Sequence, residues 1–331
     1  MRRTCIGAAV FLVAMAVALM AGSEGKEPPV KNVILIGWDG AGRQNVKEGL
    51  EAGYLPALQR LKDEGSLVAI DILRTTDTKA GWTQILTGYE PEKTGVFSNK
   101  RYEPIPKGYT LFERLEKFFG PSKILTAAVI SKKVNMGTDG PRIVPLKKGQ
   151  KAKYQVTLDG KDYEAFPGKP YFHTHGAVDI FINGLHWDKD VGKKALALIE
   201  QNKDRRFFFF VHFGEVDRKG HMFGENSSRY VDAMKSADTW TGRILDKLEA
   251  LGMDEETLVY VTSDHGFDED GVKHFDAPYV WLATNDGGVM RRGNREDIAP
   301  TIMSRFGMDL DSVEPALDGK PLTQPFTPPI W

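Results

Sequence analysis

Apolar residues gather in three short runs of the chain, and an aspartate follows each run. Asp39 lies in VILIGWDG, Asp217 in FFFFVHFGEVDRKGH and Asp264 in LVYVTSDHG. A run that is apolar throughout, without alternation, predicts a strand whose two faces are both covered. Side chains just beyond the carboxyl ends of such strands converge on one crevice. The pattern therefore predicts that three carboxylates meet at one edge of a buried sheet.

The same pattern predicts that strands and helices alternate along the chain. Pro56 and Gly65 bracket one predicted helix in the order that favours a helix start and a helix stop. This alternation is typical of an α/β domain, here a three-layer αβα sandwich around a mostly parallel central sheet. Strands are predicted at 32–37, 67–73, 124–131, 207–211, 258–262 and 277–283, and helices at 56–64, 80–87, 189–202, 228–251 and 295–306.

Residues 135–184 break the alternation. They are rich in Gly, Pro, Lys and Tyr, with short alternating pieces such as residues 154–158. We interpret them as a small cap insertion over the crevice, within a single catalytic domain that spans 24–331.

The N-terminus has the composition of a secretory signal. Arg2 and Arg3 precede an apolar run over residues 6–21, and small residues end at Ser23. The run is shorter than the ~20 residues of a membrane-spanning helix. We therefore expect a signal peptide over 1–23, no membrane span after its removal, and an exported protein, periplasmic or extracellular. Removal also takes away Cys5, the only cysteine, so no disulfide is expected.

Charge excludes one class of partner. The 331 residues include 44 Lys and Arg against 45 Asp and Glu, so the formal net charge is −1. No basic field indicates a nucleic-acid partner. The oligomeric state cannot be inferred from these numbers.

Histidines near the aspartates indicate metal chemistry. Converging carboxylates repel one another unless cations lie between them, and His221, His265 and His274 supply the nitrogen ligands that transition metals prefer. Asp217 and His221 are four residues apart and share a face of a helix. Asp264 and His265 are adjacent, so they must lie on the turn after their strand. A helix-capping aspartate beside a surface histidine is the alternative for that pair.

Thr78 is the candidate nucleophile. It lies just before the predicted helix 80–87. A hydroxyl at a helix N-terminus gains from the backbone N–H groups and the helix dipole, which favour an alkoxide or a phosphate. An ordinary threonine that caps the helix is the alternative.

In combination, these residues resemble the alkaline phosphatase superfamily, and most of all its type I phosphodiesterase/nucleotide pyrophosphatase branch. The resemblance covers nearly all of the chain after residue 23. The motifs that carry it are, in chain order, Asp39, Thr78, Thr87-Gly88-Tyr89-Glu90-Pro91-Glu92, Asp217 with His221, Ser263-Asp264-His265-Gly266, and His274.

The resemblance implies two divalent metal ions, usually zinc, as cofactors. Asn99 matches an asparagine that hydrogen-bonds a non-bridging phosphoryl oxygen, although a loop asparagine that caps a turn would look the same. Lys132 or Lys133 lies near the place where some phosphatases and phosphonate hydrolases carry a lysine that meets phosphate charge; solvated lysines are the alternative. The implied ligands of one metal are Asp39, Asp264 and His265, together with the hydroxyl of Thr78, and those of the other metal are Asp217, His221 and His274.

The resulting hypothesis is a secreted two-metal hydrolase of small phosphoric esters. Diester cleavage through a phospho-threonine is favoured over the alternatives of a phosphomonoesterase or a phosphonate hydrolase on the same site. A sulfatase would need Cys or Ser followed by Pro and Arg where this chain has Thr78-Lys79-Ala80. The alternative of another class is a non-catalytic protein that binds metal or phosphate.

Overall fold

A computed structural model of the protein describes residues 30–152 and 154–325. The strands of its main sheet are β1 (Asn32–Trp38), β2 (Ser66–Asp71), β3 (Leu125–Ile130), β7 (Ile180–Asn183), β8 (Phe207–Phe213), β9 (Thr257–Thr262), β10 (Tyr279–Thr284) and β11 (Gly293–Asn294). The α-helices in this part of the chain are α1 (Arg43–Glu51), α2 (Pro56–Glu64), α3 (Thr78–Thr87), α4 (Pro91–Thr94), α5 (Leu111–Phe119), α6 (Asp188–Gln201), α7 (Glu215–Phe223), α8 (Ser228–Ala250) and α9 (Ile298–Arg305).

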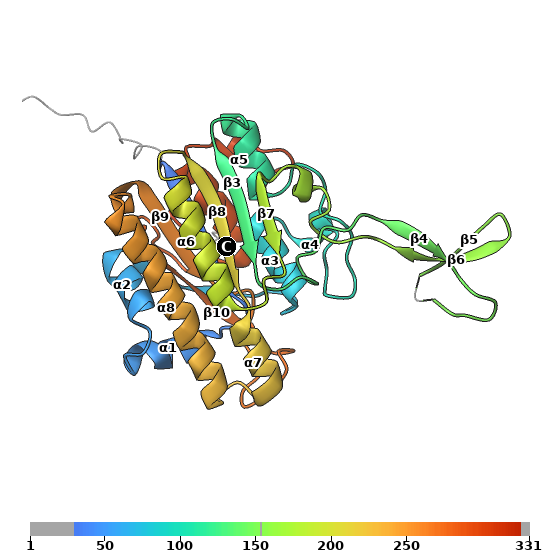
Figure 1. The fold of residues 1–331 in the computed structure, drawn as a ribbon, viewed down its shortest axis with the longest axis horizontal. Coiled ribbons are helices and arrows are strands. Elements are labelled where there is room, and N and C mark those ends of the chain that lie inside the picture. The colour runs from blue at the N-terminus through green and yellow to red at the C-terminus, as the bar shows by residue number, and fades with distance from the viewer. Residues whose placement is uncertain (1–29, 153, 326–331) are drawn as a thin grey trace, which may run out of the picture.

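The main sheet has the strand order β11-β2-β10-β9-β1-β8-β3-β7. Only β10 runs antiparallel to its neighbours β2 and β9 within the described residues; the other pairs are parallel. Helices α2, α6 and α8 pack together over one face, and α3, α5 and α9 cover the other (Figure 1). The predicted fold class, a three-layer αβα sandwich around a mostly parallel sheet, is confirmed.

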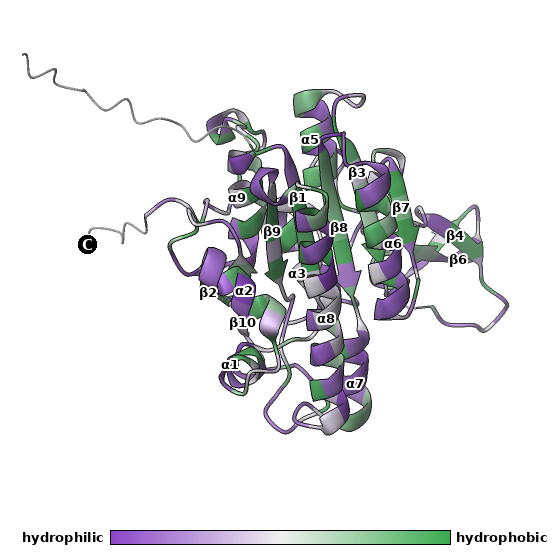
Figure 2. Ribbon diagram, turned by 60° about the vertical axis from the view of Figure 1, so that its left-hand side comes forward, coloured by the Kyte–Doolittle hydropathy of each residue, from purple (hydrophilic) through white to green (hydrophobic). Residues whose placement is uncertain are grey.

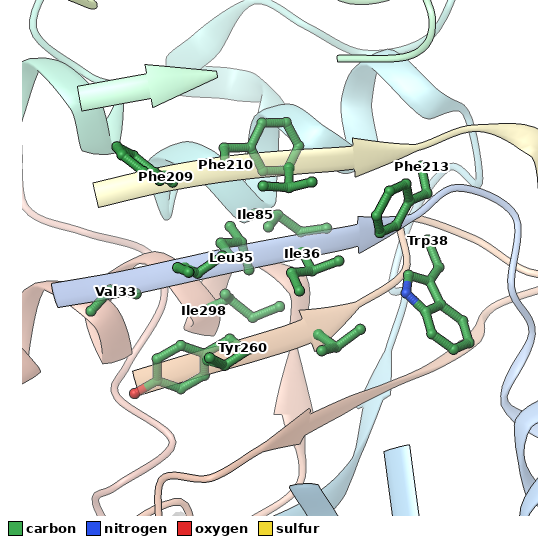
Figure 3. Packing of buried hydrophobic residues seen from close by; sticks show 14 of the residues in the cluster. Val33, Leu35, Ile36, Trp38, Ile85, Phe209, Phe210, Phe213, Tyr260 and Ile298 are labelled. Carbon is green, nitrogen blue, oxygen red and sulfur yellow. The ribbon is translucent and has the colours of Figure 1, made fainter. Parts of the chain in front are cut away.

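The two covered faces explain the unbroken apolar runs. Every residue of β1 and β8 is buried. Side chains from β1, β8 and β9 fill both sides of the sheet, and Ile85 of α3 and Ile298 of α9 pack against them (Figure 3). Figure 2 shows the same contrast in hydropathy, with β8 and β9 apolar and the helices polar on their outer faces.

The register of the three central strands aligns their carboxyl ends. β1 lies between β8 and β9, with Trp38 opposite Phe213 and Gly37 opposite Thr262. The segments that follow these strands therefore begin side by side. This alignment is what brings residues far apart in the sequence to one edge of the sheet.

The insertion forms a separate three-stranded antiparallel sheet, β4 (Arg142–Pro145), β5 (Gln155–Leu158) and β6 (Lys161–Phe166). We call residues 142–166 the arm. In Figures 1 and 2 the arm projects beyond β7 and away from the body, instead of folding back over the crevice as a cap. The predicted end of the insertion at residue 184 is also wrong. β7 pairs with β3 in the main sheet, because the edge of β3 offers its backbone groups the partners that they need.

No helix within 30–152 and 154–325 is long and apolar enough to cross a membrane. The predicted signal peptide, 1–23, lies outside the described residues, so it stays a prediction.

Candidate metal centre

The three predicted aspartates meet at the aligned strand ends. Asp39 directly follows β1, Asp264 lies two residues after β9, and Asp217 lies in the first turn of α7, which follows β8. All three side chains are buried, and Asp39 and Asp264 are fully so. Burial and then the nearby charge of Asp39 raise the pKa of Asp264 well above its ordinary value. The second of these causes is the repulsion between carboxylates that the sequence predicted.

The histidines join the carboxylates as expected. His221 follows Asp217 by one turn of α7, and its Nε2 lies 3.3 Å from Asp217 Oδ1. The ring of His274 stacks on that of His265 with centroids 4.0 Å apart, and its centroid lies 5.0 Å from that of His221. Two groups place one potential ligand atom per residue within 4.8 Å of the others: Asp217, His221 and His274; and Asp39, Asp217 and His265.

Asp217 therefore lies between the two halves of the site. The predicted first set had Asp264 where this grouping has Asp217. Asp264 Oδ2 is nevertheless 3.5 Å from His265 Nε2, while its Oδ1 accepts a hydrogen bond from the backbone N–H of Gly40 at 3.2 Å. Asp264 thus stays beside the cluster with one oxygen directed at it.

The donor atoms fit a pair of divalent metal ions. Asp217 Oδ1, Asp264 Oδ2 and His274 Nδ1 are buried without a hydrogen-bond partner among the described residues. Nδ1 of His221 lies 2.9 Å from the carbonyl oxygen of Val272, and Nδ1 of His265 lies 2.9 Å from that of Gly266. A carbonyl accepts only from a protonated nitrogen, so Nδ1 carries the proton in the neutral form of each ring, and Nε2 then has a lone pair that can bind a metal. Carboxylates with imidazole nitrogens are a typical zinc donor set.

Burial keeps the inner histidine in the ligand form. Burial, followed by the charge of His274, lowers the pKa of His265 to about 4. Burial likewise lowers the pKa of His274. Neutral imidazole is the form that binds a metal, so both rings are ready for that role at neutral pH.

Thr78 is the first residue of α3, and Asp77 is the cap that precedes it. The capping alternative is therefore wrong for Thr78. Its side chain is buried, and its Oγ1 lies 3.3 Å from His265 Nε2. The hydroxyl is thus at the positive end of a helix and at the edge of the ligand cluster, where a nucleophile would need to be.

The ammonium of Lys132 lies within the cluster of carboxylates. It follows β3 after Ser131, and its Nζ lies 2.7 Å from Asp39 Oδ1 and 2.5 Å from Asp217 Oδ2. Burial opposes its charge, but Asp217 and Asp39 outweigh burial and raise the pKa of Lys132. The predicted solvated alternative is wrong for this lysine. Lys133, by contrast, is exposed.

Comparison with known proteins identifies the family. The sequence profile described as type I phosphodiesterase / nucleotide pyrophosphatase matches residues 33–303, most of the chain. The chain belongs to this family.

Similarity to individual members is distant. Ectonucleotide pyrophosphatase/phosphodiesterase family member 1 of Mus musculus is 24% identical over 299 residues, which cover 83% of this chain and 30% of that protein. The chain thus matches under a third of the length of this relative. A solved protein of the alkaline phosphatase superfamily from Vibrio parahaemolyticus superposes with a TM-score of 0.59 at 18% identity, over 91% of this chain and 71% of the other. The alkaline phosphatase of the Antarctic bacterium TAB5 gives a TM-score of 0.54 at 15% identity, over 85% and 99%. The family match confirms the predicted resemblance to the type I phosphodiesterase/nucleotide pyrophosphatase branch, and the solved structures show the same fold.

In this phosphodiesterase-family chain, Asn99 lies beside the nucleophile candidate. Its Oδ1 accepts a hydrogen bond from the backbone N–H of Lys79 at 2.9 Å, and its Nδ2 donates to Asp77 Oδ1 at 3.3 Å. Its backbone N–H also donates to Asp77 Oδ2 at 2.9 Å. These bonds hold the amide next to the first turn of α3, on which Thr78 lies. The predicted role in phosphoryl binding stays a prediction.

Two buried residues of the site escaped the sequence analysis. His212 Nε2 donates to Asp39 Oδ2 at 2.9 Å, and both side chains are fully buried. A histidine in an otherwise apolar central strand was the available signal. Arg295 donates to the backbone carbonyl oxygens of Asp264 at 2.7 Å and Thr75 at 2.8 Å. No spacing in the sequence indicates the contacts of Arg295, because they depend on how the 3-10 turn Arg295–Asp297, just before α9, packs against α3.

Proposed function

We propose that this family member is an exported, metal-dependent phosphodiesterase that acts through a covalent phosphate on Thr78. The position of the Thr78 hydroxyl carries the proposal: it lies at the positive end of α3 and 3.3 Å from the Nε2 of His265. A small phosphate ester is the proposed substrate, in the periplasm or outside the cell.

We assign the proposed ligands from the resemblance to the family. Asp39, Asp264 and His265 would hold the ion next to Thr78, and Asp217, His221 and His274 would hold the other. When bound, such a pair of divalent ions supplies charge stabilisation to the attacking and leaving oxygens and lowers the pKa of a hydroxyl or a water.

The chain's own residues would then carry out a double displacement. Thr78 Oγ gives up its hydroxyl proton and attacks phosphorus, its bond to phosphorus forms, and the ester bond breaks as the leaving oxygen departs and takes up that proton. Water then adds its oxygen to phosphorus, the bond to Oγ breaks, and Thr78 regains its hydroxyl proton. The Asn99 amide and the positive end of α3 stabilise the charge on the equatorial oxygens.

A cavity beside Asn99 favours diesters over monoesters. It has a volume of about 660 Å³ and lies between residues 101–103 and the base of the arm. Its lining includes Tyr102, Ile143, Tyr154 and Phe166, and the Tyr154 hydroxyl donates to the carbonyl of Lys100, next to Asn99, at 3.2 Å. Arg101, Glu103 and Arg142 also line it, so the space is mixed in polarity. Its aromatic side chains suit a second ester group, which a monoester lacks. Lys132 is the observation that favours a monoesterase or a phosphonate hydrolase, because an ammonium near phosphorus suits a more highly charged ester.

The proposal is tested with nitrophenyl monoesters, diesters and phosphonates on zinc-loaded protein. Thr78→Ala should retain its zinc and lose activity by about 1,000-fold or more, because a covalent nucleophile is removed. Thr83→Ala is the matched control; its hydroxyl donates to the Lys79 carbonyl within the same helix. Peptide mapping of acid-quenched wild type should find phosphate on the Thr78 peptide.

Each outcome separates the alternatives. Full activity of Thr78→Ala on every ester would overturn the nucleophile assignment. The highest kcat/KM on a monoester or on a phosphonate would select that alternative over diester cleavage. Zinc binding without turnover of any ester would show that the chain is a non-catalytic binding protein.

A further inference from the structure

Lys132 makes a bridge that the proposed mechanism does not require. Its ammonium joins Asp39, which follows β1, to Asp217, which lies on α7. The lysine side chain is only 14% exposed, so solvent screens these two contacts weakly. Asp39 and Asp217 are both among the proposed metal ligands.

Lys132 contacts the one oxygen of Asp39 that does not accept the hydrogen bond from His212. Oδ2 of Asp39 accepts from His212 at 2.9 Å. Oδ1 is then the oxygen open to a cation, and Lys132 Nζ lies 2.7 Å from it. The Nε2 of His265 is also 3.6 Å from Oδ1, so an ion held by His265 and Asp39 would use this atom.

A metal ion and the ammonium cannot share that oxygen at low energy. Ligand oxygens lie about 2 Å from zinc. A lysine retained on the same oxygen would face a doubly charged ion at close range in a buried site, where the repulsion between charges is strong. The lysine stem has four carbons and many rotamers, so the ammonium can withdraw without moving the backbone.

We propose that Lys132 competes with the metal ions for Asp39 and Asp217, so that metal binding displaces its ammonium and this lysine sets the metal affinity of the site. The inference rests on the metal-binding part of the proposed function. It assigns Lys132 two opposite effects. In the apo-protein the ammonium neutralises two buried carboxylates, and in the loaded protein it adds positive charge near the phosphoryl position.

The test is a zinc titration of the full chain after removal of metal by chelator, with zinc alone and no substrate. Lys132→Met keeps the stem and removes the charge, so its zinc affinity should rise by about tenfold or more, the range measured for close charge pairs. Lys132→Arg should stay near wild type because it keeps the charge. Lys133→Met is the matched control, since Lys133 is the exposed neighbour.

A second measurement, phosphate binding by the zinc-loaded proteins, tests the effect of Lys132 in the loaded site. Inorganic phosphate should bind more weakly to Lys132→Met than to wild type, because the loaded site has lost one positive charge. Equal or weaker zinc binding by Lys132→Met would overturn the proposal and leave Lys132 as a structural support for the two carboxylates. Lys132→Gln is measured in the same way if Lys132→Met does not fold.

Failure of this inference differs from failure of the proposed function. If no variant binds zinc, the metal centre itself is wrong, and the phosphodiesterase proposal fails with it. If wild type binds zinc and hydrolyses esters while Lys132→Met binds zinc no more tightly, only the competition is wrong.

Discussion

His212 is the residue that orients Asp39. It is fully buried in β8, and its Nε2 donates to Asp39 Oδ2, so Asp39 Oδ1 faces the cluster. Partners behind a metal ligand typically change metal affinity by 10–100-fold when removed. We expect His212→Phe, which keeps an aromatic ring but removes the donor, to lower zinc affinity by about that factor, measured by competition with a chelator.

Two further variants separate orientation from packing at this position. His212→Gln restores a donor and should recover part of the zinc affinity. His175→Phe removes an exposed imidazole and should change nothing. Unchanged zinc affinity of a folded His212→Phe would contradict the orienting role.

At the scale of elements, α6 and α7 hold each other's N-termini. Asp188, the first residue of α6, accepts hydrogen bonds from the backbone N–H groups of Gly214 at 2.9 Å and Glu215 at 3.2 Å. Glu215 Oε2 accepts in return from the backbone N–H of Asp188 at 2.9 Å. Because Gly214 precedes α7 and Asp217 lies in its first turn, these bonds help to position a ligand candidate.

The buried carboxyl group of Asp188, next to Glu215, makes the stability of the fold depend on pH. Burial, and then the charge of Glu215, raises the pKa of Asp188 to about 7 in the folded protein, above its ordinary value of 3.8. The folded state therefore holds this proton more tightly than the unfolded state. The contribution of Asp188 is most favourable below pH ~4 and is lost as the pH rises toward 7. Asp188→Asn keeps an acceptor oxygen and has no carboxyl to titrate.

We compare the free energy of unfolding of Asp188→Asn with that of wild type at pH 5 and at pH 8. The difference, variant minus wild type, should be larger at pH 8 by at most about 3 kcal/mol. Urea unfolding at both pH values measures it. Asp190→Asn, on the same turn of α6, is the control. A difference from wild type that does not change with pH would contradict the prediction.

At the scale of the whole molecule, the arm is an addition to a complete sandwich. Its ends meet: a Cβ placed on Gly168 would lie 2.7 Å from the backbone nitrogen of Pro141. Ile143 and Phe166, at its base, line the cavity beside Asn99, while Leu158, near its tip, is half exposed and lies outside that lining. A short Gly-Ser linker can therefore replace residues 142–166 without strain on the main sheet.

We expect this replacement to leave cooperative unfolding intact and to lower kcat/KM for bis(nitrophenyl) phosphate about tenfold, because a buried aromatic group contributes roughly 1–3 kcal/mol. The kcat/KM for methyl nitrophenyl phosphate, which has no large second group, should change little. Phe166→Ala should reproduce part of the effect, and Leu158→Ala should not. An equal loss on both diesters would place the arm's role in folding instead of substrate binding.

Local patterns predicted those regular elements well whose ends carry their own signals. The predicted helix 56–64 agrees with α2, because proline and glycine mark its ends. α5 was missed although Thr110 and Glu113 form a capping box at its start, a signal that local sequence does carry. β7 was missed because a four-residue edge strand has too little pattern of its own, and only pairing with β3 defines it.

The sequence by itself determined the fold class, the family and the order of the proposed ligands, because buried strands need unbroken apolar runs and the chemistry needs particular side chains after them. Tertiary structure decided the contacts within the site. Strand register placed Asp217 between the two ligand groups, joined His212 to Asp39 and brought Lys132 onto both carboxylates. Those distances depend on how separate strands align, and no spacing along one chain contains that information.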